Sequence, residues 1–91
     1  MNFEFKTTPS FRRALAKLTA EQQRSALAAF KLFRVNPFDP RLRSHKIHRL
    51  SALYGKTIYS ACIESDLRAV FYIEGNTVVS VDIGTHVIYR S

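Results

Sequence analysis

The spacing of apolar residues changes along the chain and separates a helical first part from a strand-rich last part. Residues 2–6 alternate, with Phe3 and Phe5 on one side, and this pattern predicts a short strand with one buried face. Apolar side chains then recur every three or four positions up to residue 35, which predicts two amphipathic helices. Period-two alternation returns later in the chain and predicts three consecutive strands. These strands span residues 57–64, 67–73 and 77–83.

Both expected helices carry recognisable start signals. Thr8 can cap the first helix, with Pro9 at its first helical position. Thr19 opens the second helix, and Gln22 three residues later completes a capping box. The Asn–Pro step at residues 36–37 ends this helix, because the residue before a proline is pushed away from helical dihedral angles. Almost no loop separates the two helices, so we expect an antiparallel hairpin.

The order of these elements, β-α-α-β-β-β, predicts a single α+β domain over residues 1–91, since the chain is too short for two domains. We expect an antiparallel sheet with the N-terminal helical hairpin packed on one face. Residues 41–50 are expected to form a loop with a short strand. In the strand at 67–73, one face is more apolar and should meet the helices. This face carries Leu67, Ala69, Phe71 and Ile73.

Arg68 falls on the other, open face of the same strand, near the middle of the sheet. An arginine in this position is costly unless it is paired or functional. If Ile73 pairs with Thr77, Arg68 lies opposite Asp82, and the two residues can form a structural ion pair. The alternative is that Arg68 binds a phosphate on a concave surface, and the pattern leaves both interpretations open.

The charge balance points to an anionic partner. Fourteen Lys and Arg residues against seven Asp and Glu residues give a net charge of +7. Nucleic acid is the first partner to consider for such a small basic domain, and an acidic protein is the second. The single cysteine, Cys62, excludes an internal disulfide framework and a cysteine-rich metal site. We expect no membrane partner and a cytoplasmic location, because there is no apolar run of about 18 residues and no signal-peptide pattern.

Several residues supply the groups that metal-independent RNA cleavage requires. The reaction needs a base for the ribose 2′-hydroxyl, an acid for the leaving 5′-oxygen, and cations for the charge that develops on the phosphate. His45 or His48, together with His86, suits the two proton roles, Arg68 suits the phosphate, and Tyr89 can stack a base. The remaining RNA-binding candidates are Arg41, Arg43, Lys46, Arg49, Tyr54, Lys56 and Arg90. The histidines lack the carboxylate or cysteine spacing of a metal site, so no metal or other cofactor is expected.

Three stretches resemble the RelE/ParE toxin superfamily, and the YafQ-like branch in particular. They are residues 36–46 (NPFDPRLRSHK), 66–72 (DLRAVFY) and 82–90 (DIGTHVIYR). The resemblance covers essentially the whole chain. It implies the toxin of a type II toxin–antitoxin pair, an mRNA endoribonuclease that usually acts on the ribosome. It also implies a small acidic antitoxin, encoded next to the toxin, that wraps the open face. Operator DNA would be bound only through the antitoxin complex, which often represses its own operon.

The resemblance also assigns roles to individual residues. His45 matches the histidine before the Lys-hydrophobic step of YafQ-like toxins, and Asp66 matches an active-site aspartate. His86 matches the histidine of the Gly-Thr-His ending, Tyr89 the aromatic residue after it, and Arg68 the arginine of the central strand in RelE and YoeB relatives.

The chain departs from this pattern at Cys62, where YafQ-like toxins carry a histidine, and it lacks the further Lys and Arg that RelE uses near its C-terminus. Two alternatives therefore stay open. One is a ParE-type toxin that poisons gyrase without cutting RNA. The other is a catalytically weak member that acts as a binding module or operon co-repressor.

Overall fold

The structure is a computed structural model that describes residues 3–64 and 66–85. Three α-helices, a short 3-10 helix and five strands lie within these ranges. In chain order they are β1 (Glu4–Thr7), α1 (Pro9–Ala16), α2 (Ala20–Val35), η1 (Pro40–Leu42), β2 (His45–Lys46), α3 (His48–Tyr54), β3 (Tyr59–Glu64), β4 (Leu67–Glu74) and β5 (Thr77–Gly84). The α+β class is confirmed.

The five strands form one sheet in the order β1-β5-β4-β3-β2, with β1 at one edge. β2 to β5 pair antiparallel, as expected, but β1 runs parallel to β5, so the sheet is mixed. Two further hydrogen bonds continue this pairing past the end of β1. The Thr8 amide donates to the Ser80 carbonyl at 3.0 Å, and the Thr8 hydroxyl donates to the Val81 carbonyl. These bonds tie the start of α1 to the middle of β5.

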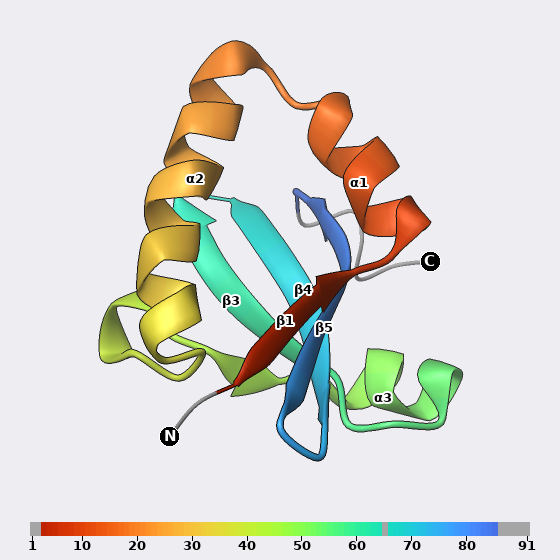
Figure 1. Cartoon of the computed structure of the whole chain (residues 1–91). Helices are drawn as coiled ribbons and strands as arrows, with labels where there is room; N and C mark the ends of the chain where they lie inside the picture. The colour runs from red at the N-terminus through yellow and green to blue at the C-terminus, as the bar shows by residue number, and fades with distance from the viewer. Residues whose placement is uncertain (1–2, 65, 86–91) are drawn as a thin grey trace.

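Both N-terminal helices begin where the sequence predicts. The Thr8 hydroxyl accepts a hydrogen bond from the Phe11 amide at 3.1 Å. Thr19 and Gln22 exchange the two reciprocal bonds of a capping box at 3.0 and 3.1 Å. The helices lie on the same side of the sheet and diverge from their shared turn, with α1 packed on β5 and α2 reaching toward β3 (Figure 1). They therefore form a splayed hairpin.

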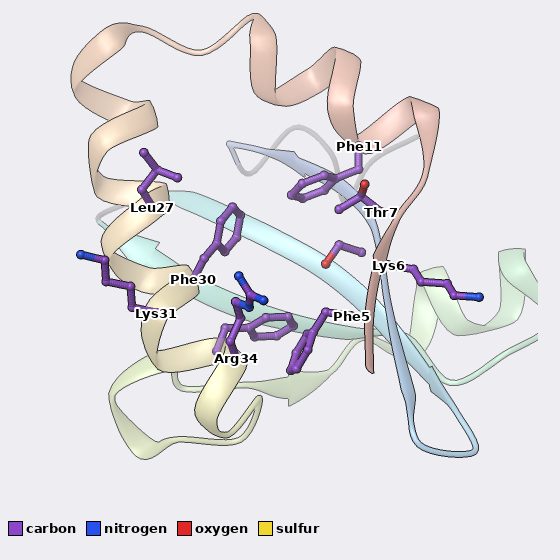
Figure 2. A pocket seen from close by; sticks show the side chains of 10 residues that line it. Phe5, Lys6, Thr7, Phe11, Leu27, Phe30, Lys31 and Arg34 are labelled. Carbon is purple, nitrogen blue, oxygen red and sulfur yellow. The ribbon is translucent and has the colours of Figure 1, made fainter. Parts of the chain in front are cut away.

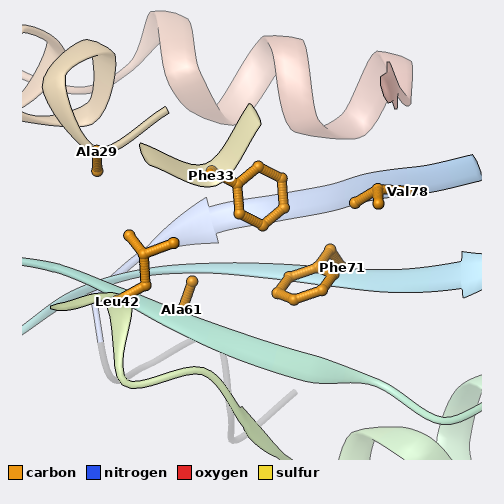
Figure 3. Close-up of a cluster of buried hydrophobic side chains, with 6 residues drawn as sticks. All are labelled: Ala29, Phe33, Leu42, Ala61, Phe71 and Val78. Atoms are coloured by element: carbon orange, nitrogen blue, oxygen red, sulfur yellow. The ribbon is translucent and has the colours of Figure 1, made fainter. Parts of the chain in front are cut away.

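The main core lies between these helices and the sheet, and it confirms the expected apolar face of β4. Phe71 is 0% exposed and is the centre of an aromatic cluster. Its ring lies 4.8 Å from that of Phe33 and 5.5 Å from that of Tyr59, measured between centroids. Figure 3 shows the buried side chains that surround it. Leu67 and Ala69 on the same face pack with Phe11 in a neighbouring cluster. Each aromatic contact of this kind stabilises the fold beyond the contribution of the apolar area that it buries.

The opposite face of the sheet is partly covered by α3, a helix that the sequence analysis expected to be loop. Leu50 of α3 is buried against Ile58, Val70 and Val81. The Ser51 hydroxyl accepts from the Ile58 amide at 2.8 Å and so fixes the helix to the start of β3. The helix ends at Gly55, whose φ of 68° belongs to the left-handed region that glycine adopts without strain.

The pairing of β4 with β5 differs from the expected register. Ile73 pairs with Val78 instead of Thr77, which is a first shift by one residue. An irregularity between Val70 and Phe71 then shifts the register a second time, near the start of β4. Asp82 is consequently opposite Val70, and the partner of Arg68 is Gly84. The expected Arg68–Asp82 pairing across the strands is therefore wrong. Val81 is the extra residue of this bulge, and it packs with the α3 cluster.

Candidate active site

Arg68 lies on the face of the sheet that points away from α1 and α2. It stands in β4 between Cys62 of β3 and Gly84 of β5, its direct partners on either side. Its Nη1 atom is 3.2 Å from the Cys62 sulfur and 3.3 Å from the Leu67 carbonyl. The side chain is half-buried, so these contacts hold the guanidinium close to the sheet surface. A planar guanidinium in this position can present donors to a phosphate.

His45 belongs to the same face. It pairs with Ser60, Ser60 with Val70, and Val70 with Asp82, which forms one row across four strands. Directly paired residues project to the same side of a sheet, and Arg68 is two positions from Val70 on its strand. The His45 side chain is exposed at the edge of this row. The structure thus brings His45 and Arg68 to one surface from separate strands.

A backbone contact determines which nitrogen of His45 can act as a base. Nδ1 lies 2.9 Å from the Arg43 carbonyl oxygen, which can only accept a hydrogen bond. Nδ1 therefore carries the proton, and Nε2 of the neutral ring is left with a lone pair. Arg43 adopts a left-handed conformation, with φ of 51°, at the end of η1. This turn points its carbonyl at the imidazole.

Lys46 follows His45 on β2 but lies on the opposite face. It pairs with Tyr59, whose ring stacks on Phe71 in the helix-side core. Lys46 is exposed there at the sheet edge, so it does not share the Arg68 surface directly.

The predicted cation Arg41 is held by a carboxylate away from the Arg68 face. Its Nε and Nη2 atoms lie 3.0 and 2.9 Å from the two oxygens of Asp39. These hydrogen bonds hold the pKa of Asp39 below its ordinary value and raise the pKa of Arg41. Arg41 lines a hollow of about 320 Å³ between α2 and β3, on the helix side of the sheet edge.

Lys56 lies at the far end of the surface that carries Arg68. Its Nζ atom is 2.9 Å from Glu74 and 4.3 Å from the centre of the Tyr72 ring. The hydrogen bond to Glu74 raises the pKa of Lys56, so this cation keeps its charge. Tyr72 is on the same face of β4 as Arg68, four positions along the strand.

The remaining predicted residues fall into three groups. His48, Arg49 and Tyr54 are all exposed on α3, next to the part of the sheet that this helix covers. Asp66 is exposed in the turn between β3 and β4. The other predicted residues lie outside the described residues; they are His86, Tyr89 and Arg90.

Three further polar residues on the Arg68 surface were not among the predicted site residues. Cys62 contacts Arg68, and Ser60 is 0% exposed between His45 and Val70 in the cross-strand row. Asp82 ends this row, and its Oδ1 accepts from the Ile83 amide at 2.8 Å. Alternation along residues 57–64 places Ser60 and Cys62 on one face, which was the available signal. Their proximity to Arg68 needed the register of β3 and β4.

No group of three or more His, Cys, Asp and Glu side chains is placed to hold a metal ion within residues 3–64 and 66–85. In the same part of the chain, none of the helices has the length and apolar character needed to span a bilayer.

Solved structures identify the fold. No protein-family model and no curated protein matches the chain. YafQ from E. coli strain BL21(DE3) matches with a TM-score of 0.75 and 12% identity, over 99% of this chain and 100% of that one. The chain has a RelE-like fold.

Two complexes support this assignment. A chain of the archaeal RelE–RelB complex from Pyrococcus horikoshii OT3 matches with a TM-score of 0.71 and 15% identity, over 93% of this chain and 96% of that chain. A chain of the RelBE2 toxin–antitoxin complex from Mycobacterium tuberculosis matches with a TM-score of 0.62 and 22% identity, over 94% and 100%. In this RelE-like fold, the surface that faces away from α1 and α2 carries His45 and Arg68.

Proposed function

We propose that the chain is the toxin of a type II toxin–antitoxin pair and cuts mRNA, in association with the ribosome and without a metal. The observation that carries the proposal is the shared surface of His45 and Arg68. It combines an imidazole whose Nδ1 lies against a carbonyl oxygen with a guanidinium held against the sheet. The RelE-like fold and the net charge of +7 agree with it. A small acidic antitoxin, encoded next to the toxin, is the proposed protein partner, and operator DNA is contacted only through their complex.

The proposed reaction is an attack by the ribose 2′-oxygen on the adjacent phosphate. His45 Nε2 takes the 2′-hydroxyl proton, and the new bond to phosphorus forms a 2′,3′-cyclic phosphate. The bond to the 5′-oxygen breaks, and this oxygen takes a proton, for which His86 is the proposed acid. Arg68 stabilises the charge that develops on the phosphate oxygens. Asp66 and Tyr89 are the remaining proposed catalytic residues. Because His48 lies on α3, the position of His45 supports it as the base.

The remaining predicted cations suit contacts with the phosphate backbone of an RNA strand. Arg43, Arg49 and Lys56 are exposed around β2 and α3, on the side of the molecule near the proposed site, and Tyr54 offers an aromatic surface beside them. Cationic contacts of this kind position the backbone and make binding weaker as salt rises. Lys46, Arg41 and Arg90 complete the proposed RNA-binding set.

The test is cleavage of an mRNA fragment by the purified chain, with and without ribosomes, in the presence of EDTA. We expect 2′,3′-cyclic phosphate ends, and we expect Arg68→Ala to lower the cleavage rate by about 10²–10³-fold, as for loss of one donor to a developing oxyanion. Arg13→Ala, on the exposed side of α1, is the matched control. Equal rates for the two variants, or dependence on a metal, would exclude the mechanism. Growth inhibition with intact mRNA and altered DNA supercoiling would favour gyrase poisoning.

A further inference from the structure

Two hollows on the helix side of the sheet differ in the polar groups that line them. The larger, of about 570 Å³, lies between β1, α1 and α2, and Figure 2 shows Phe5, Phe11 and Phe30 around it. Its charged lining residues are cations, with no Asp or Glu among them. The smaller, of about 320 Å³, lies between α2 and β3 and is lined in part by Glu64. This smaller one, which we call the α2–β3 hollow, therefore offers an acidic group to a ligand.

The α2–β3 hollow exists because α2 carries small side chains where it faces β3. Ser25 is three and four positions from Ala28 and Ala29, so these residues lie on one face of the helix. The remaining walls are largely apolar and come from Leu32, Leu42 and Ile63. The volume is near the lower end of the range for small-molecule sites, about 300 Å³, so the hollow suits a small ligand.

Glu64 supplies this hollow with a hydrogen-bond acceptor that lacks a donor. Its Oε1 atom is shielded from solvent, and no group of the described residues donates to it. Glu64 pairs with Leu67, which belongs to the helix-side core, so the carboxylate lies on the same side of the sheet. The last torsion of a glutamate side chain is broad, so either oxygen can turn toward the hollow. A buried acceptor without a donor costs free energy, and a ligand with N–H groups would remove this cost.

Arg41 brings hydrogen-bond donors to the same hollow. Asp39 binds its Nε and Nη2 atoms, and Nη1 takes no part in these bonds. Among the residues that the structure describes, no ion pair joins Arg41 to Glu64. The acceptor and the donors of the hollow are therefore both available to a ligand that carries complementary groups.

The backbone of Cys62 adds a further donor and acceptor. Cys62 lines the hollow although its sulfur contacts Arg68 on the other face, so its backbone forms this part of the wall. The Ile58 carbonyl accepts from the Ile47 amide, and alternate residues of a strand point their backbone groups to the same edge. Those of Cys62 therefore face outward, beyond the two residues of β3 that pair with β2.

We infer that the α2–β3 hollow binds a guanine base, with Glu64 accepting from its N1–H and 2-amino groups while Arg41 and the Cys62 amide face its acceptors. Guanine has two neighbouring donors on its Watson–Crick edge, which match the two oxygens of a carboxylate. A simple ammonium ligand has no acceptor for Arg41 and would be repelled by it. That the guanine belongs to an RNA strand rests on the proposed function, whereas the chemistry of the hollow does not.

The hollow adjoins the proposed catalytic base. Arg41 lines it, and the carbonyl of Arg43, two positions on, contacts His45. Ser60 is the strand partner of His45, and Cys62 lies two positions further, about 7 Å along β3. An RNA strand at His45 can therefore pass over the sheet edge and place a nearby base in the hollow.

Labelled 2′-O-methyl oligonucleotides test the inference without cleavage, because they lack the attacking hydroxyl. The probes are octamers of uridine with one central guanosine, inosine or adenosine, and inosine differs from guanosine only by loss of the 2-amino group. We expect the purified chain to bind the guanosine octamer about tenfold more tightly than either of the others. Equal binding of the three octamers would overturn the inference.

Substitution of Glu64 tests whether this carboxylate reads the base. Glu64→Ala should bind the guanosine and inosine octamers equally, and Glu64→Gln should lower their ratio, since an amide has one acceptor oxygen. Glu4→Ala, on β1 at the opposite edge of the sheet, should keep the tenfold ratio. Each ratio is taken within one protein, so a general loss of folded protein does not change it. A full ratio in Glu64→Ala or in Glu64→Gln would overturn the assignment to this hollow.

GMP distinguishes a free nucleotide from a base of RNA. In NMR spectra, GMP should shift the amide signals of Cys62, Ile63 and Glu64 and leave those of β1 unchanged. Shifts that avoid these three residues would overturn the inference. An octamer that binds at least tenfold more tightly than GMP assigns the base to an RNA strand, and equal affinities assign it to a free guanine nucleotide.

The cleavage assay separates this inference from the proposed function. For a cleavable RNA with one guanosine, Glu64→Ala should raise KM about tenfold and leave kcat within twofold. A chain that prefers the guanosine octamer but cuts no RNA would retain the hollow and lose the nuclease. A chain that cuts RNA but binds the three octamers equally would retain the nuclease and lose the hollow.

Discussion

The two faces of β4 differ in what they contribute to the molecule. On one side, Phe71 is buried among aromatic rings from α2 and β3. On the other side, Arg68 lies half-buried against a sulfur and a carbonyl, with His45 exposed on the same surface. One face of this strand thus builds the core, and the other face carries residues of the proposed site. Because side chains alternate, substitutions one residue apart should affect different properties.

The largest expected effect on stability is at Phe71. Phe71→Ala should lower the free energy of unfolding by about 3–5 kcal/mol, since it removes a fully buried ring and leaves a cavity. Urea unfolding measures the change. Glu74→Ala, at the exposed end of the same strand, should change it by less than about 1 kcal/mol. Similar losses for the two variants would mean that the aromatic face does not dominate stability.

A smaller loss of stability should follow from Leu50→Ala. This variant tests how much α3 stabilises the fold by packing on the face of the sheet that carries Arg68. Leu50 is buried against Ile58, Val70 and Val81, so its truncation should cost about 2–4 kcal/mol. Leu53→Ala on the same helix is the matched control, because Leu53 is 67% exposed and should cost under about 0.5 kcal/mol. If Leu50→Ala behaves like its control in thermal or urea unfolding, the packing of α3 on this face adds little to the stability of the fold.

The smallest effect concerns Asp39, which belongs to neither face. Arg41 holds the pKa of Asp39 below the ordinary value of 3.8, so the ionised carboxylate stabilises the folded chain. This contribution is complete above the unfolded pKa, about 3.9, and is lost as the pH falls through the lower folded pKa. Asp39→Asn should therefore be less stable than the natural chain at neutral pH, and the gap should close well below pH 3.8. A gap in urea unfolding that is equal at both pH values would contradict this account.

The sequence predicted those features of the fold that depend on local patterns. Alternation in residues 67–73 identified the buried face of β4, and Thr8 and Thr19 marked both helix starts. α3 was missed because Ile47, which precedes it, makes no side-chain cap, and because the helix depends on Leu50 meeting a distant sheet. Gly55 was the one local signal of its end.

The positions of the candidate site residues in the fold were only partly predictable from the sequence. Alternation sufficed to place Arg68 on the surface away from the helices. Its neighbours depend on register, and the bulge at Val81 moves Asp82 by one position in a way that alternation does not reveal. The contact of Cys62 with Arg68 likewise follows from the pairing of two strands. His45 and Lys46 lie on opposite faces because they form the two-residue strand β2, and the sequence pattern did not define this strand.

The parallel pairing of β1 with β5 has a consequence for synthesis of the chain. Thr8 and Val81, which are joined by a hydrogen bond, lie 73 positions apart in the sequence. A nascent chain can form the capped helices early, but β1 has no neighbour until the last described strand has been made. Contacts this distant close a long loop and slow folding. Any activity that needs the assembled sheet therefore begins only after β5 has left the ribosome.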